Sequence, residues 1–308
     1  MKADVRQRMA VSEFLVRMKQ RGINMASFTN YATLSYNGGI TNSNTVTGEL
    51  VEVLSATKTA VSDQYGANDE ITYVISIVNS GTVAVDGLTV ADDLGGYLFN
   101  EETVYPLSYQ TDSLRYYVNG ALQTQAEVTA GPPLSIRGIQ VPAGGNTLLI
   151  YKAAVTAYAP PGQGKSITNT AVITGANIDT PLEVTETVQA EERARLSISK
   201  AVCPTSVAEN GQLTYTFTIE NTGNTEAGTA DHVILSDVFN PILKLVSVTY
   251  NGTAWTEDAE NYTYDETTGL FQTVDGQITV PAASYTQNAD GTWSVTPGSA
   301  VIVITGTV

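Results

Sequence analysis

The chain of 308 residues is 42% hydrophobic and only 15% charged, and its 31 acidic against 15 basic side chains give a formal net charge of −16. An acidic excess this large excludes nucleic acid as a general partner. The single cysteine, Cys203, and the single histidine, His232, exclude an internal disulfide and any metal site built from several such ligands.

The same inventory argues against catalysis and membrane insertion. His232 lies in DHVILSD, with no nucleophile motif such as G-x-S-x-G nearby, so we interpret it as a structural residue. We expect no enzymatic activity, no cofactor and no metal. No apolar run of 18 residues is present, so membrane insertion is not expected either.

Residues 1–24 differ from the rest of the chain. They hold six of the fifteen bases but only two acids, and three of the four methionines, the fourth being Met25. Their apolar residues are spaced for a short amphipathic helix, and no apolar core long enough for a signal peptide is recognisable. We hypothesise that translation begins at Met25 and that residues 1–24 are a non-native upstream extension.

After residues 25–50, two stretches of the chain repeat one pattern. VLSATKTAVSDQYGANDEITYVISIVNSGT (53–82) matches RLSISKAVCPTSVAENGQLTYTFTIENTGN (195–224). Each stretch has a short strand-like segment with a lysine, Lys58 or Lys200, then a turn, then an alternating segment that closes on Asn-x-Gly. A repeat of this length indicates two copies of one structural unit.

The match continues beyond these stretches. LTVADDL (88–94) matches VILSDVF (233–239), which aligns Asp92 with Asp237. RYYVNGALQ matches SVTYNGTAW, and each places Asn-Gly between apolar alternations, a strong hairpin signal.

Short alternating segments separated by turns predict an all-β fold. We predict two tandem immunoglobulin-like antiparallel β-sandwiches, at residues 51–190 and 191–308. The charged segment VQAEERARL (188–196) is the expected linker.

The recurring motifs carry a family resemblance. The order Lys, then Gly-x-x-[ILV]-Thr-Tyr-x-[FIV]-x-[IV]-x-Asn-[ST]-Gly, then [VI]-x-[VL]-x-Asp-x-[LF] resembles the DUF11 repeat and covers nearly all of residues 53–308. This resemblance implies a β-sandwich domain of bacterial cell-surface proteins with a structural or adhesive role. Unlike typical surface chains of that family, this chain shows no secretion signal and no wall-sorting motif.

The two repeats end differently. NTLLIYKAAV (146–155) corresponds to SAVIVITGTV (299–308), but the first repeat continues through SITNTAVITG (166–175) and PLEVTETVQA (181–190). We therefore expect the C-terminal sandwich to lack its last strand. SFTNYATLSYNG (27–38) resembles SITNTAVITGAN, so residues 25–50 look like a final strand or hairpin in front of the first repeat.

These two features predict strand donation between copies. Phe28, Asn30, Ala32 and Leu34 form the predicted donor strand, and the β-branched run with Val301 and Val303 forms the predicted acceptor edge. An uncovered sandwich edge favours strand addition. Because donor and acceptor lie at opposite ends of the chain, the predicted product is a head-to-tail homopolymer.

Three alternatives stay open. The chain could be a piece of a longer array, or residues 27–50 could fold back on the first sandwich through the turn-like SYNGGIT. It could also be a monomeric or array-forming adhesin or ligand-binding module. What it would bind is not indicated by the sequence.

A lysine, an aspartate and an asparagine suggest a covalent lock in the first sandwich. Lys58, Asp92 and Asn169 fall on its expected first, middle and last strands. Buried together, a neutral Lys amine could attack the Asn carboxamide while a protonated Asp polarises its oxygen, giving an isopeptide bond and ammonia.

The second sandwich supplies Lys200 and Asp237 but no matching asparagine, and Asn30 of another copy would fill that place. The overall hypothesis is a structural subunit of a pilus-like filament on a bacterial cell or spore surface, with itself as partner.

Overall fold

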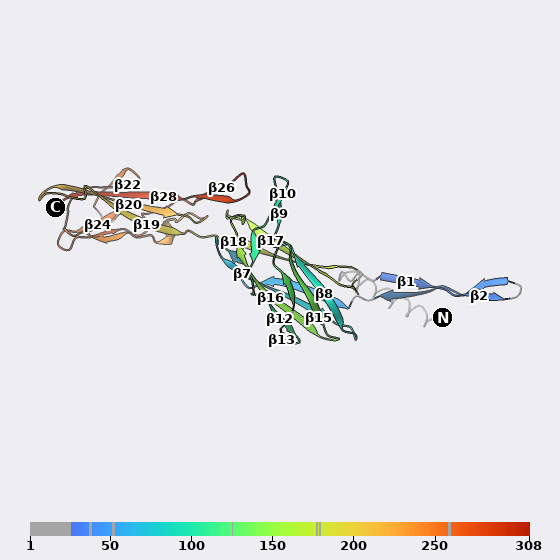
Figure 1. The fold of residues 1–308 in the computed structure, drawn as a ribbon. Helices are drawn as coiled ribbons and strands as arrows, with labels where there is room; N and C mark the ends of the chain where they lie inside the picture. The colour runs from blue at the N-terminus through green and yellow to red at the C-terminus, as the bar shows by residue number, and fades with distance from the viewer. Residues whose placement is uncertain are drawn as a thin grey trace, which may run out of the picture.

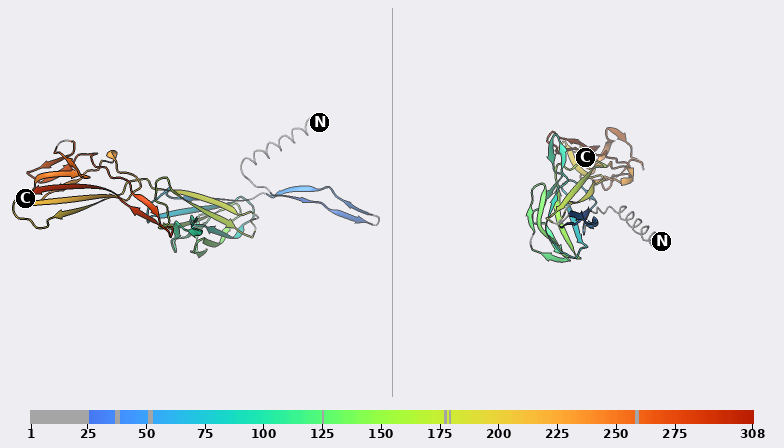
Figure 2. Two further views of the ribbon diagram at one scale, coloured as in Figure 1. Left: turned by 90° about the horizontal axis from the view of Figure 1, so that it is seen from above. Right: turned by 90° about the vertical axis from the view of Figure 1, so that its right-hand side faces the viewer.

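The structure is a computed structural model that describes residues 26–36, 39–50, 53–124, 126–176, 178, 180–257 and 260–308. In Figures 1 and 2 a two-stranded arm, a first sandwich (domain 1) and a second sandwich (domain 2) follow one another along a rod. The arm projects from one end and the C-terminus lies at the other (Figure 1). The expectations for residues 1–24 lie outside the described residues.

The arm is a β-ribbon made of two consecutive strand pairs. Its strands are β1 (Ala26–Asn30), β2 (Thr33–Tyr36), β3 (Gly39–Asn42) and β4 (Val46–Leu50). β1 pairs with β4, and β2 pairs with β3. No strand of either sandwich pairs with the arm in the described part of the chain, so it does not fold back on domain 1.

Domain 1 packs two sheets face to face. One sheet has the order β13-β12-β16-β7-β5, with β11 also beside β16, and the other has the order β14-β15-β8-β17-β18-β6. The first sheet holds β5 (Leu54–Ala60), β7 (Glu70–Asn79), β11 (Leu107–Tyr109), β12 (Arg115–Val118), β13 (Ala121–Gln123) and β16 (Asn146–Val155). The second holds β6 (Gln64–Tyr65), β8 (Val85–Asp92), β14 (Glu127–Thr129), β15 (Leu134–Val141), β17 (Ser166–Thr174) and β18 (Leu182–Ala190). A separate hairpin joins β9 (Tyr97–Phe99) to β10 (Glu102–Val104).

Alternation of apolar and polar residues builds the core of domain 1. Along β7, Ile71, Tyr73, Ile75 and Ile77 are buried and their neighbours face outward. The opposite sheet places buried residues of β8, β15 and β17 against them. This is the two-layer solution that a sheet with one apolar face requires.

Domain 2 repeats the first sheet of domain 1 but not the whole of the second. Its larger sheet has the order β19-β20-β28-β22-β23, and its smaller sheet has only β21-β25-β24. The larger sheet holds β19 (Leu196–Cys203), β20 (Gln212–Asn221), β22 (Lys244–Tyr250), β23 (Thr253–Trp255) and β28 (Gly298–Thr307). The smaller holds β21 (Ser236–Val238), β24 (Tyr262–Asp265) and β25 (Leu270–Thr273), and a further hairpin joins β26 (Ser284–Gln287) to β27 (Trp293–Thr296). A 3-10 turn, η1 (Thr229–Asp231), precedes β21.

The predicted all-β fold with two tandem sandwiches is confirmed. Both Asn-Gly pairs form hairpin turns: Asn119-Gly120 joins β12 to β13, and Asn251-Gly252 joins β22 to β23. All four residues have positive φ, which Asn and Gly tolerate best. Among the described residues, no helix is long and apolar enough to cross a membrane.

The predicted acceptor edge is wrong. β28, which carries Val301 and Val303, lies between β20 and β22 and pairs with both. The amide of Val301 also donates to the side chain of Asn251 at 2.8 Å. A central strand has no free backbone groups to offer another chain. The open edge of domain 2 therefore lies on another strand.

Candidate functional site

Domain 1 encloses the three residues that the sequence singled out for a covalent lock. Lys58 Nζ lies 2.6 Å from Asp92 Oδ2, and neither side chain is exposed at all. The hydroxyl of Tyr151 donates a hydrogen bond to the same carboxylate oxygen. The Lys58 amine also lies 5.0 Å from the centre of the Tyr73 ring. β5, β8, β7 and β16 thus contribute one residue each to this cluster.

Asn169 completes the cluster from β17. Ala171 of β17 is opposite Asp92 of β8, so Asn169, two residues earlier, is on the same inward face. It is fully buried, and neither its amide nitrogen nor its amide oxygen has a hydrogen-bond partner among the described residues. An unpartnered buried amide is costly, because both polar groups have left water without replacement.

Burial sets the protonation states of this cluster. Desolvation lowers the pKa of Lys58 from its usual value, although the attraction of Asp92 opposes the shift. Desolvation and the nearby Asp92 raise the pKa of Tyr151 well above its usual value. Burial therefore shifts Lys58 toward the neutral amine, which is the nucleophilic form.

Domain 2 holds the same lysine and aspartate in an open setting. Lys200 Nζ bonds Asp237 Oδ2, but the two side chains are 40% and 19% exposed. The amine lies 4.6 Å from the centre of the Tyr215 ring and 5.3 Å from those of Phe217 and Phe239. These aromatic rings form the floor of a site that lacks a cover.

The cover is absent because two strands of domain 1 have no counterpart in the described part of domain 2. In domain 1, β17 pairs with β8, and β18 pairs with β17 and lies over β5. In domain 2, β21 takes the place of β8 and pairs only with β25, so its other edge is free. The sequence predicted that domain 2 lacks one strand. In its described part it lacks the counterparts of two strands, β17 and β18.

The strand that β18 would cover is left exposed in domain 2. Lys58 of β5 is buried, and Leu54 and Ala56 are half-buried, whereas Leu196 and Ile198 at the matching positions of β19 are exposed, Ile198 to 56%. Val238 beside the free edge is 61% exposed. We call the space bounded by the free edge of β21 and the uncovered face of β19 the acceptor cleft.

The predicted donor residues lie on the arm, at the other end of the rod. Asn30 is the last residue of β1 and is exposed, Ala32 lies in the connection to β2, and Phe28 and Leu34 belong to β1 and β2. The side chains of Phe28 and Leu34 are outside the described part of the chain. Within one chain the structure does not bring Asn30 near Lys200 (Figure 1).

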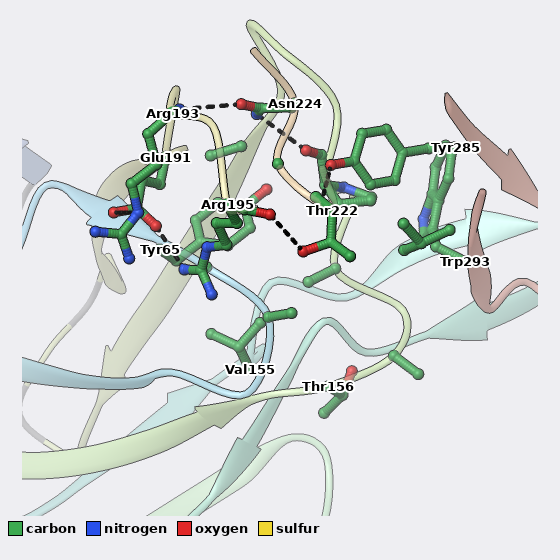
Figure 3. A pocket seen from close by; sticks show the side chains of 18 residues that line it. Tyr65, Val155, Thr156, Glu191, Arg193, Arg195, Thr222, Asn224, Tyr285 and Trp293 are labelled. Atoms are coloured by element: carbon green, nitrogen blue, oxygen red, sulfur yellow. Dashed lines mark hydrogen bonds and ion pairs between the residues drawn. The ribbon is translucent and has the colours of Figure 1, made fainter. Parts of the chain in front are cut away.

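A cavity of about 250 Å³ lies where domain 1 meets domain 2, and the sequence analysis did not predict it. Figure 3 shows Tyr285 and Trp293 on one side of it, with Arg195 and Glu191 opposite. The Arg195 guanidinium is 2.6 Å from Glu191, and the Tyr285 hydroxyl donates to Thr222 O at 3.0 Å. One sequence feature could have pointed to this cavity. The segment VPAASYTQNADGTWSVTPGS of the second repeat, which holds Tyr285 and Trp293, is longer than its counterpart VPAGGN in the first repeat.

His232 and Cys203 both lie on the surface, away from the cluster in domain 1. His232 Nδ1 lies 2.7 Å from Asp275 Oδ2, and both side chains are exposed. Cys203 is free and exposed at the end of β19. No group of three or more His, Cys, Asp or Glu that could hold a metal occurs in the described ranges.

Comparison with known proteins gives likenesses of fold only. No family model matches the chain, and no curated protein matches it. It is similar to the major pilin subunit BcpA of Bacillus cereus, with 16% identity, a TM-score of 0.33, and coverage of 88% of this chain and 73% of that one. For the pilus backbone RrgB of Streptococcus pneumoniae the values are 11%, 0.34, 79% and 55%.

A third likeness is to a family 123 glycoside hydrolase of Clostridium perfringens, with 8% identity and a TM-score of 0.28. That match covers 44% of this chain, which spans only 27% of the hydrolase. At these values the similarities say nothing about function, and the DUF11 resemblance stays a prediction.

Proposed function

We propose that the chain is a structural subunit of a filament on the surface of a bacterial cell or spore. Subunits would join head to tail when the arm of one copy enters the acceptor cleft of the next. The observation that supports this most is the pairing of an unattached ribbon at one end of the rod with an uncovered cleft in the far domain. An isolated two-stranded ribbon is marginally stable in water, so the arm gains by docking.

The burial of apolar surface supplies the driving force. Exposed Leu196, Ile198 and Val238 would leave water when the cleft is covered, and fully burying each such side chain is worth about 1.5–3 kcal/mol. The free edge of β21 would also gain backbone partners. Because the contact joins different surfaces on the two copies, it propagates rather than closing into a dimer.

The proposal includes covalent locks. In domain 1, Lys58 and Asn169 would join through an isopeptide bond with Asp92 as the acid, and the unpartnered amide of Asn169 supports this. Between subunits, Lys200 of one copy and Asn30 of the next would join beside Asp237. No enzymatic turnover is involved, because each site reacts once.

Electron microscopy and size-exclusion chromatography test the filament. We expect purified protein, both the full chain and a chain beginning at Met25, to form filaments. Removal of residues 26–50 should leave monomers only, since the sandwiches stay intact while the donor is lost. Monomers from every protein with the arm present would contradict the proposal.

A second candidate function is a ligand-binding module. The cavity beside Tyr285 and Trp293 favours it, because ligand sites are concave, largely apolar and frequent between domains. A protein of this kind would remain monomeric with its arm present, so the same experiment separates the two functions.

A further inference from the structure

By comparison with domain 1, the acceptor cleft stands where a strand pair, and not a single strand, would lie. In domain 1, β17 occupies the edge of β8, but it is β18 that lies over β5. The Glu186 carboxylate of β18 accepts a hydrogen bond from the Ala60 amide of β5 at 3.2 Å. One added strand would therefore pair with β21 and still leave Ile198 and Lys200 of β19 uncovered.

We propose, on the basis of the proposed function, that the occupant is the arm of a second copy. Residues 27–35, which run from β1 into β2, take the register of β17, and β4 takes that of β18. The two ribbons are built alike. Thr168 is opposite Thr187 in β17–β18, with their hydroxyl oxygens 3.1 Å apart, and Thr29 is opposite Thr47 in β1–β4. The next pairs along are Asn169 with Glu186 and Asn30 with Val46.

The inward positions of the two ribbons also correspond. Ile167, Asn169, Ala171 and Ile173 are the buried residues of β17. The match of SFTN to SITN sets Phe28, Asn30, Ala32 and Leu34 at these four positions. A shift of one residue would turn all four to the outer face, so the register is strongly specified.

This register assigns neighbours along β21. Ala171 is opposite Asp92 and Val172 is opposite Ala91 in domain 1. Transferred to domain 2, Ala32 is opposite Asp237 and Thr33 is opposite Ser236. Tyr31 takes the place of Thr170, whose carbonyl oxygen accepts a hydrogen bond from the Asp93 amide and whose amide donates to the Asp93 side-chain carboxylate.

Two exposed apolar side chains would meet as a result. Tyr31 is 59% exposed on the free arm, and Val238, which aligns with Asp93, is 61% exposed beside the cleft. At the far end of the ribbon, Ala190 pairs in parallel with Tyr65. The equivalent residues are Leu50 and the half-exposed Val207, so the ribbon leaves the cleft at the outer end of domain 2 and its own domain 1 continues the rod.

Disulfide trapping between copies tests the register. In a Cys203→Ser background, Thr33→Cys protein is mixed with Ser236→Cys protein and oxidised mildly. Directly opposite residues of antiparallel strands have Cα atoms about 4.5–5.5 Å apart, within disulfide range. In an equimolar mixture we expect about half of the Thr33→Cys protein to form a disulfide-linked heterodimer, because its arm can enter the cleft of either protein.

The matched control replaces Ser236→Cys by Ile234→Cys, two residues before Ser236 and just ahead of β21. Its Cα would lie about 7–8 Å from residue 33, too far for a disulfide. Cross-linking at 234 but not 236, or filaments with no cross-link at 236, would overturn the register and leave the filament standing. Absence of any association would overturn the filament as well.

A separate observation concerns the joint between the two domains. In domain 1, the short turn at residues 142–145 connects β15 to β16. Domain 2 has the β26–β27 hairpin at the equivalent place. In domain 2, β21 is followed by β22, whereas domain 1 has the β9–β10 hairpin inserted after β8. Each domain thus carries one insertion, and the two insertions touch.

Several contacts join them. Gln287 Nε2 donates to the Tyr97 hydroxyl at 3.0 Å, and the Trp293 amide donates to Ala157 O at 2.9 Å. Gly291, at the tip of β26–β27 with φ of 85°, sits so near the β9–β10 hairpin that a Cβ there would lie 3.1 Å from Phe99 and Val104. From these contacts we infer that β26–β27 is a clasp that fixes domain 2 on domain 1.

The clasp joins domain 1 to domain 2 of the same chain. At a joint between subunits, domain 2 would face the domain 1 of the next copy, and among the described elements the β9–β10 and β26–β27 hairpins both lie at the other joint. A filament would therefore bend at the joints between subunits and stay straight within each subunit.

Trypsin tests the clasp, because the linker 191–195 contains Arg193 and Arg195. Replacing residues 284–297 by Gly-Gly, after the pattern of domain 1, should speed cleavage at these arginines about tenfold, which corresponds to about 1.4 kcal/mol of lost coupling. The control is Thr296→Ala, an exposed residue of the same hairpin. Equal cleavage rates in the swapped and control proteins, with both domains folded, would overturn the clasp.

Discussion

Filaments boiled in SDS are expected to run as a ladder of covalent multimers, and Asn30→Ala is expected to reduce that ladder to the single-chain band. In the free subunit, the Lys200 side chain is 40% exposed and pairs with Asp237. Seating the arm would cover it, and burial disfavours the charged form of a lysine. The neighbouring Phe217 and Phe239 rings have no polar group to offer a neutral amine.

The reaction that follows is a transamidation. The Lys200 proton passes to Asp237, the neutral amine attacks the Asn30 carboxamide carbon, and the protonated Asp237 polarises the carboxamide oxygen. The C–N bond to the amide nitrogen breaks, and that nitrogen leaves as ammonia with the protons released by the amine. No oxidant or external reagent is needed, so mixing alone should yield the ladder.

Matched variants separate the lock from assembly. Asn30→Ala and Lys200→Arg should still form filaments, because strand pairing and apolar burial are retained, but SDS should dissolve them into single chains. Thr29→Ala, whose residue sits at an outward position of the same strand, should keep the ladder, as should Lys58→Ala. A ladder that survives both Asn30→Ala and Lys200→Arg would show that the bond is formed elsewhere.

The sequence predicted those parts of the fold that depend on local pattern. Alternation defined the strands of the two sandwiches, and the Asn-Gly pairs at 119–120 and 251–252 fixed two hairpins, because positive φ is a local demand. Lys58 and Asp92 could be placed together because both repeats carry them at the same positions.

The free edge could not be found in this way. Val301 and Val303 stand in the strongest β-branched run near the C-terminus, but the neighbours of β28 are β20 and β22, which precede it in the chain. The actual free edge belongs to β21, a strand of three residues with little pattern of its own. Strand order depends on non-local pairing, which single-sequence periodicity does not encode.

The intact mass of the protein is expected to be about 17 Da below the sum of its residues, one ammonia for the bond between Lys58 and Asn169. Asp92→Asn should restore the full mass, because an amide cannot take the lysine proton and return it to the leaving group. Tyr151 remains to hydrogen-bond the new side chain, so the variant keeps the shape of the site.

Asp92→Asn is also expected to lower the free energy of unfolding of domain 1 by about 3–5 kcal/mol, since Lys58 is left buried without its partner. The chain supplies the matched control: Asp237→Asn removes the partner of Lys200 in the open site and should cost at most about 1 kcal/mol in the monomer. Hydrogen exchange of β7 and β16 in urea follows domain 1. The fluorescence of Trp255 and Trp293, the two tryptophans of the chain, follows domain 2.

The two measurements answer different questions about one cluster. A full mass in the unaltered protein, with a large loss in Asp92→Asn, would leave a buried ion pair without a bond and would refute the lock in domain 1. Equal losses in Asp92→Asn and Asp237→Asn would contradict the premise that cover by β17 and β18 creates the reactive environment. By the same reasoning, Lys200 and Asp237 of domain 2 should react only after the arm of another copy has covered them. Domain 1, whose cluster is already covered, therefore serves as the reference for the joint between subunits.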